Sequence, residues 1–121
     1  MSVTRIEERT IFGTQGEVRI YNHCLADISK ARPLNGEGYR IFHYLLGKIT
    51  KDNTVPGPSA TARDMELERS HVSRAYQQML SDGYIVKHDD VWSVHPFIAY
   101  YGTEGRRAQA IQKLSFNLIR E

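Results

Sequence analysis

Apolar residues recur at helical spacing in the first half of the chain. Phe42, Leu45, Leu46 and Ile49 fall at positions i, i+3, i+4 and i+7. This spacing places all four side chains on one face of a helix. The pattern therefore predicts a core helix that begins near Gly36.

The same spacing returns in the second half of the chain. Four apolar residues carry it there: Val72, Ala75, Tyr76 and Met79. Gly83 follows where a left-handed residue commonly ends a helix. A shorter helix is predicted just before, from Ser59 as its N-cap to Met65, with Ala62 on the inner side. Two short helices joined by a tight turn predict a helix-turn-helix over residues 59–82.

Two β-rich runs follow Gly83. Residues 84–88 and 91–94 are separated by Asp89-Asp90, a dipeptide typical of turns, so we expect a hairpin over residues 84–95. A second hairpin is predicted over residues 5–21, since residues 17–21 alternate in polarity. The segment 22–32 has mixed periodicity and fits either a short helix or a loop.

A last helix is predicted over residues 105–119. Its apolar stripe contains Ile111, Leu114 and Leu118, which fits either a core face or a dimer seam. We favour the dimer seam, because helix-turn-helix proteins commonly pair to bind two half-sites. The expected fold is therefore a single α+β domain, residues 1–121: a winged helix-turn-helix with an N-terminal β-hairpin and a C-terminal helix.

Composition adds two expectations to this picture. The single cysteine, Cys24, cannot form an internal disulfide, and the N-terminus carries neither a secretory signal nor an apolar span. We therefore expect a cytoplasmic protein that is not in a membrane. The net charge of +2 is too balanced to indicate a nucleic-acid partner, so the placement of the charges must decide.

The helix over residues 69–81 places its charges unevenly. Ser70, Ser73, Arg74 and Gln77 lie opposite its apolar face, and no carboxylate lies among them. Such a stripe is also typical of a solvated helix surface. Its position between a helix-turn and a hairpin favours insertion into the major groove of DNA, where Arg74 would bind guanine and Gln77 adenine.

Further basic residues extend this expected interface. Lys87 is expected to contact phosphate from the hairpin strand, whereas the acidic hairpin tip is expected to serve as a turn. Arg106 and Arg107 would reach flanking phosphates, unless they are the solvated end of a dimer helix. The expected DNA-binding residues are Arg69, Ser70, His71, Ser73, Arg74, Gln77, Gln78, Lys87, Arg106 and Arg107.

No residue pattern points to catalysis. The five histidines show no metal-ligand spacing, and the seven tyrosines have no neighbouring metal cluster to activate them. His23 beside Cys24 could suggest a catalytic thiol, but no third, orienting residue can be named. We therefore expect no enzymatic activity, no catalytic residue, no metal ion and no cofactor.

The run from Arg69 to Ala75 resembles the start of the recognition helix in bacterial winged-helix proteins. Ala62 and the residues 83–86 resemble the inter-helix contact and the entry into the wing of those proteins. Glu66 and Glu68 depart from the pattern, since glycine and serine are common at their positions, and this departure puts the angle between the two helices in doubt.

Most of the chain resembles the RepL-type replication proteins of bacterial plasmids and phages. The likeness lies in the Thr-Gln-Gly-Glu turn at residues 14–17, the helix at residues 41–46, the run 51–55, and His95-Pro96 leading into a basic tail at residues 102–107. It implies a role on plasmid or phage DNA, in replication or its control. A transcriptional regulator that binds an operator as a dimer stays open, as does a winged helix used only for protein binding.

Overall fold

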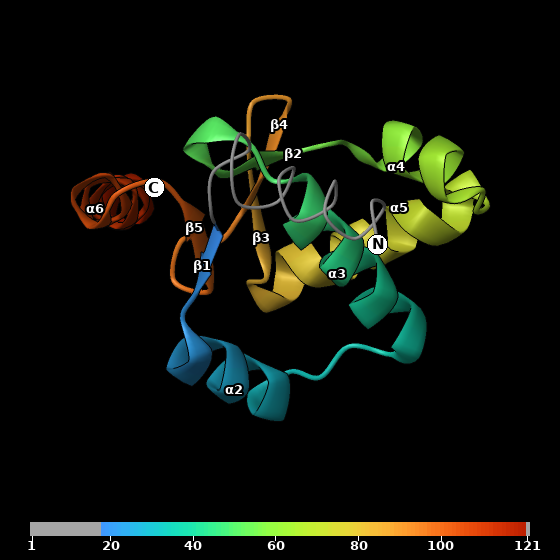
Figure 1. Cartoon of the computed structure of the whole chain (residues 1–121), viewed down its shortest axis with the longest axis horizontal. Coiled ribbons are helices and arrows are strands. Elements are labelled where there is room, and N and C mark those ends of the chain that lie inside the picture. The colour runs from blue at the N-terminus through green and yellow to red at the C-terminus, as the bar shows by residue number, and fades with distance from the viewer. Residues whose placement is uncertain (1–17, 121) are drawn as a thin grey trace, which may run out of the picture.

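The computed structural model describes residues 18–120, and the side chains of residues 18–114. These residues form an α+β fold of five α-helices, one 3-10 helix and two small antiparallel sheets (Figure 1). In chain order the elements are β1 (Val18–Ile20), α2 (Asn22–Ala31), α3 (Gly36–Lys48), η2 (Lys51–Asn53), β2 (Thr54–Val55), α4 (Pro58–Met65), α5 (Arg69–Asp82), β3 (Ile85–His88), β4 (Val91–Val94), β5 (Ala99–Tyr101) and α6 (Glu104–Arg120).

The core forms where α3 packs against α5. Ile41, Phe42 and Leu45 of α3 are almost fully buried, and Val72, Tyr76 and Met79 of α5 are 0% exposed. Five of these six residues belong to the apolar stripes whose spacing predicted the two helices; Ile41 was not part of the predicted stripe, and Ile49, which was, lies just past the end of α3. Burying a large apolar side chain contributes about 1.5 to 3 kcal/mol. The shared core therefore fixes the inner face of α5 against the rest of the molecule.

Three strands form the sheet that follows α5. Their order is β2-β4-β3, and all neighbours are antiparallel. The hairpin of β3 and β4 was expected from the sequence, and its register pairs Ile85 with Val94 and Lys87 with Trp92. Strand β2 was not expected. It comes from the segment between α3 and α4, so it joins the hairpin to the helices.

The second sheet pairs two distant segments. Strand β1 lies antiparallel to β5, with Val18 opposite Tyr101 and Ile20 opposite Ala99. The sequence predicted a strand here, but with residues 5–12 as its partner, and those residues lie outside the described part of the chain. The partner of β1 in the structure is β5, from the other end of the domain. Alternating polarity in one segment predicts a strand but does not indicate its partner.

Asn53 connects the two sheets. It is 3% exposed and has a positive φ of 63°. Its side-chain amide donates to the carbonyl oxygens of Val94 (3.0 Å) and Ala99 (2.7 Å), and its Oδ1 accepts from the backbone N–H of Tyr101 (2.7 Å). One side chain thus ties the end of β4 to β5.

Helix α2 is attached through Tyr84. The Tyr84 hydroxyl donates to the carbonyl of Arg32 at 2.9 Å, just past the end of α2, and its ring meets the Phe42 ring edge to face at 5.2 Å. Burial raises the pKa of Tyr84 to about 12, so the hydroxyl keeps its proton at physiological pH. The segment 22–32, for which the sequence left helix and loop open, is a helix from Asn22 to Ala31.

Helix α6 begins beside the small sheet. In Figure 1 it lies at the end of the molecule that is opposite α4, and β1 and β5 lie between it and the core. The start and end of α6 agree with the predicted C-terminal helix to within one residue. Helix α6 and the α4–α5 turn therefore lie at opposite ends of the molecule.

The role of Asn53 gives the first testable prediction. Asn53→Ala removes three hydrogen bonds from buried backbone groups, so it should lower the free energy of unfolding by about 3 kcal/mol, measured by urea denaturation. Asn22→Ala, on the exposed side of α2, should change it by less than about 0.5 kcal/mol. Equal effects of the two substitutions would show that Asn53 does not connect the sheets.

Candidate nucleic-acid interface

The outer face of α5 carries most of the expected interface. Six of its expected residues are exposed and Ser73 is half-buried; the exposed ones are Arg69, Ser70, His71, Arg74, Gln77 and Gln78. Because the inner residues are fully buried, the orientation of α5 about its own axis is fixed. The structure therefore brings these seven residues together on one helix surface.

Tyr76 holds α5 in place from below. Its hydroxyl donates to the Pro56 carbonyl at 2.6 Å, so the Thr61 hydroxyl, 2.7 Å away, donates to Tyr76 in turn. Its ring meets the Trp92 ring edge to face at 5.0 Å. Burial raises the pKa of Tyr76 to about 12, which keeps the donated proton in place. One residue thus joins α5 to α4, to the segment before α4 and to β4.

A surface cluster joins α3 to α4. The Tyr44 hydroxyl of α3 donates to the carboxylate of Asp64 on α4, and the Lys48 ammonium lies 3.9 Å from the same carboxylate. Burial, followed by this hydrogen bond, raises the pKa of Tyr44 to about 12. The helix that precedes α5 is therefore fixed on two sides.

The turn between α4 and α5 is tight and strained. The Leu67 backbone N–H donates to the Ala62 carbonyl at 2.9 Å, and Glu66 adopts a left-handed conformation with φ 57° and ψ 47°. Glu68 is the N-cap of α5 but makes no side-chain cap hydrogen bond. Glu66 and Glu68, the two positions where the sequence departs from the common pattern, are thus the two positions with an unfavourable feature. Glu66 has a strained backbone conformation, and Glu68 leaves the start of α5 without a side-chain cap.

The two arginines of α5 are not paired with acids. Neither Arg69 nor Arg74 has an ion-pair partner among the side chains of residues 18–114, whereas Asp82 at the end of α5 is paired with Arg32 (3.8 Å). The Nε of Arg74 donates to the Ser70 carbonyl at 3.4 Å, which leaves its two terminal amino groups free to bind. Positive charge is therefore available on this surface.

Two other residues of this face already have polar partners. The Ser70 hydroxyl donates to the Glu68 carboxylate at 3.3 Å, and the Gln78 side-chain amide donates to Asp82 at 2.7 Å. Gln77 and Arg74 lie between them. A ligand that binds Arg74 and Gln77 would therefore break fewer existing hydrogen bonds than one that binds Ser70 and Gln78.

The hairpin offers one cation and an acidic tip. The Lys87 ammonium lies 4.8 Å from the centre of the Trp92 ring, a cation–π contact that holds it over the sheet. His88, Asp89 and Asp90 at the tip are all exposed, and Asp89 has a positive φ of 56°. Lys87 remains available to an anion, whereas the tip would repel one.

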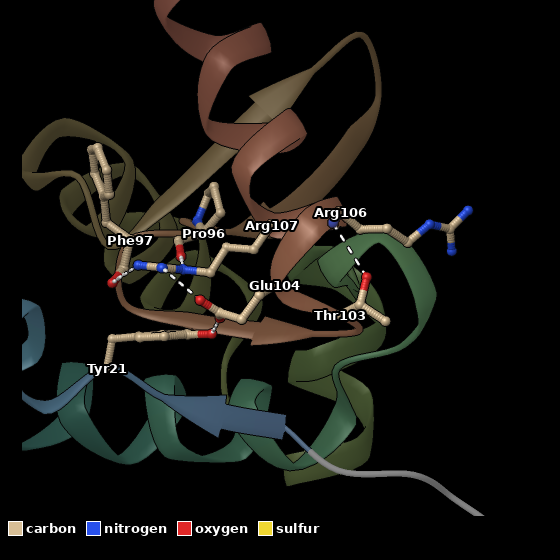
Figure 2. Close-up of polar contacts among 7 residues, drawn as sticks. All are labelled: Tyr21, Pro96, Phe97, Thr103, Glu104, Arg106 and Arg107. Carbon is tan, nitrogen blue, oxygen red and sulfur yellow. Dashed lines mark hydrogen bonds and ion pairs between the residues drawn. The ribbon is translucent and has the colours of Figure 1, made fainter.

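The structure separates the two C-terminal arginines. Figure 2 shows the Arg106 side chain pointing away from the protein and the Arg107 side chain lying against it. The Arg107 guanidinium lies 3.4 Å from the centre of the Tyr21 ring and donates to the Pro96 carbonyl at 2.8 Å, while Glu104 accepts a hydrogen bond from the Tyr21 hydroxyl. The hydrogen bond that the Tyr21 hydroxyl donates to Glu104 raises the pKa of Tyr21. Arg107 is therefore taken up by contacts inside the protein, and Arg106 is the member of this pair that is exposed.

The apolar stripe of α6 is only partly covered. Ile111 and Leu114 are half-buried, and the side chain of Leu118 lies outside the described residues. The structure thus places two of the three expected dimer residues on one side of α6.

Arg63 is a basic residue that sequence reasoning did not single out. It is the only basic residue of α4, it is exposed, and it has no ion-pair partner in the described part of the chain. In the sequence, the apolar residues of α4 define its inner side at Ala62, and the charged residue next to Ala62 was not considered. A search for unpaired cations near the turn would have found Arg63.

Neither a metal centre nor a membrane span appears in the described residues. No group of three or more His, Cys, Asp or Glu side chains there is arranged to hold a metal ion. Likewise, no helix within residues 18–120 has the length and apolar character needed to cross a membrane. Comparisons with protein-family models, with characterised proteins and with solved structures find no match to this chain.

The strained turn gives the second prediction. Glu66→Gly should raise the free energy of unfolding by about 0.5 to 1 kcal/mol, because glycine adopts the left-handed conformation without a steric penalty. Glu66→Ala removes the same charge without this relief, so urea denaturation should find it less stable than Glu66→Gly. Equal stability of the two variants would show that residue 66 is not held at positive φ.

Proposed function

We propose that this protein binds double-stranded DNA and that α5 enters the major groove. The observation that carries the proposal is the outer face of α5, where two arginines without acidic partners in the described part of the chain lie beside serine hydroxyls and glutamine amides. Tyr76 holds the inner face of the same helix in place. Arg, Gln and Ser are the side chains that bind base edges and phosphates. A helix that is already rigid loses little conformational entropy when it binds, so it can present these side chains at a low cost in binding free energy.

The order of the elements supports a winged helix-turn-helix. Helices α4 and α5 are joined by a three-residue turn, and the β3–β4 hairpin follows α5 almost directly. Strand β2 pairs with β4, so the hairpin is anchored beside the two helices rather than projecting freely. In this proposal the hairpin is the wing, and Lys87 is its phosphate contact.

The resemblance to RepL-type proteins makes replication of plasmid or phage DNA, or its control, the role that we propose. A regulator that binds an operator would use the same surface. In either role the protein would act by occupying its DNA site and by recruiting or excluding replication or transcription proteins. This follows from the expectation that it has no catalytic residue of its own. A winged helix that binds only proteins is the alternative of another class, and it predicts no affinity for duplex DNA.

We further propose that two chains pair through α6. Ile111 and Leu114 present a half-buried apolar stripe on a helix that lies away from the proposed DNA-binding surface. Pairing there would leave α5 free in both chains. Two-fold pairing would match a site made of two half-sites.

Arg74 provides the test of DNA binding. Arg74→Ala should weaken binding to duplex DNA by about 1 to 3 kcal/mol, because a charged hydrogen bond to a base edge or to a phosphate contributes that much. Fluorescence anisotropy with a duplex selected from a random library measures the affinity. Arg19→Ala is the matched control: it removes the same charge from exposed β1, and its affinity should be unchanged.

Circular dichroism of both variants confirms that they fold. Two results would contradict the proposal: no duplex binding by the unsubstituted protein at low salt, or equal affinities of the Arg74→Ala and Arg19→Ala variants. The first of these would favour the protein-binding alternative.

Leu114 provides the test of pairing. Leu114→Glu places a charge in the apolar stripe, so light scattering at tens of micromolar should give a monomer mass where the unsubstituted protein gives a dimer. Gln112→Glu adds the same charge at an exposed position of α6 and should leave the dimer intact. A monomer mass for the unsubstituted protein would contradict pairing, and DNA binding would then be by one chain.

A further inference from the structure

We propose that a cleft beside α5 receives a backbone phosphate of the bound duplex, and that Arg74 is the ligand of this phosphate. The inference rests on the proposed function and assigns a partner to one side of its binding surface. It differs from the expectation, drawn from the sequence, that Arg74 binds guanine. What carries it is the shape and the charge of the space around Arg74.

The cleft has a volume of about 470 Å³. Helix α5 forms one wall, and the segment that leads into α3 forms the other. The lining residues are Pro33, Leu34, Asn35, Glu37, Gly38, His71, Arg74, Ala75 and Gln78. Ser70, Ser73 and Gln77 are absent from this lining, so the polar face of α5 divides into a side that borders the cleft and a side that does not.

The cationic donor of the cleft is on α5, whereas the opposite wall offers the neutral side-chain amide of Asn35. Arg74 uses its Nε for the Ser70 carbonyl at 3.4 Å, so its two terminal amino groups are the free donors. His71 is exposed beside it, one turn earlier. The amide nitrogen of Gln78 is already bonded to Asp82 at 2.7 Å. An anion in the cleft would therefore bind first to Arg74.

The carboxylates around the cleft are paired with other cations. Glu37 lies 3.4 Å from Arg40, and Asp82 lies 3.8 Å from Arg32. Arg74 has no such partner among the described residues. The positive charge in the cleft is thus the one that lacks a counter-ion, which is the condition for binding an anion from outside.

The dimensions of a helix in the major groove place a phosphate at this position. An α-helix with its side chains is about 10 to 12 Å across, and the groove is about 12 Å wide. Side-chain groups that point straight into the groove therefore meet base edges, and groups that lie at the flank of the helix meet the phosphates that border the groove. Arg74 begins opposite the core, but its long side chain lines the cleft together with His71 and Gln78, so its guanidinium lies toward the flank. The cleft opens on the flank of α5 that faces α3.

Salt dependence separates a phosphate ligand from a base ligand. Arg74→Ala should weaken binding to the selected duplex and to a scrambled duplex by the same factor, about tenfold, and should reduce the slope of log affinity against log salt by about one. Gln77→Ala, on the other side of the face, should weaken binding to the selected duplex alone and leave the slope unchanged. A loss for Arg74→Ala that is confined to the selected duplex would overturn the inference.

A second pair of variants tests the opposite wall without touching α5. A side chain at Gly36 or at Gly47 of α3 meets no atom within 4 Å of its Cβ, so Gly36→Glu and Gly47→Glu should both fold. Gly36 adjoins the cleft residues Asn35 and Glu37, so Gly36→Glu should weaken binding to both duplexes about tenfold by repelling the phosphate. Gly47→Glu, at the other end of α3, should not. Equal affinities of the two variants would overturn the inference.

Inorganic phosphate distinguishes the DNA backbone from a free phosphate as the source. Inorganic phosphate should displace the duplex no better than chloride at the same ionic strength; stronger displacement would mean that the cleft binds free phosphate and would overturn the inference. Failure of the cleft leaves duplex binding by the unsubstituted protein intact. Absence of that binding would instead remove the proposed function itself.

Discussion

The hydrogen bond from the Tyr76 hydroxyl to the Pro56 carbonyl is the contact on which the presentation of α5 depends. A buried phenol must donate its one proton, and here the acceptor lies in the segment that connects β2 to α4. Thr61 and the Trp92 ring complete the surroundings of Tyr76 from α4 and β4. Since all three neighbours contact a single residue of α5, that helix cannot rotate or shift without breaking several contacts together.

The sequence predicted the parts of this arrangement that depend on local periodicity. The stripes of α3 and α5, the glycine that ends α5 and the β3–β4 hairpin are each encoded within a few residues. The exposed face of α5 follows from the same periodicity, because a buried stripe determines what lies opposite it. The sequence also singled out Glu66, which stands where glycine is common and does adopt a left-handed conformation.

The remaining features depend on contacts between distant segments. Asn53 looks like an ordinary loop residue, and its role appears only once β4 and β5 lie on either side of it. The pairing of β1 with β5 and the contact of Arg107 with Tyr21 likewise join residues about 80 positions apart. In the sequence Arg107 cannot be distinguished from Arg106, because its neighbours Tyr21 and Pro96 are set by the fold.

A continuous set of contacts joins α5 to the start of α6. Tyr76 meets Trp92 on β4, Asn53 binds the end of β4 and β5, and Arg107 fixes the first turns of α6 against the residues between those strands. Each of these contacts is buried or part-buried and directional, so none allows much rotation. If two chains pair through α6, the distance between their α5 helices is set by this path rather than by a flexible linker. A protein built in this way would discriminate among DNA sites by the spacing of two half-sites as well as by their bases, because a wrong spacing would strain the buried contacts of Asn53 and the part-buried contacts of Arg107.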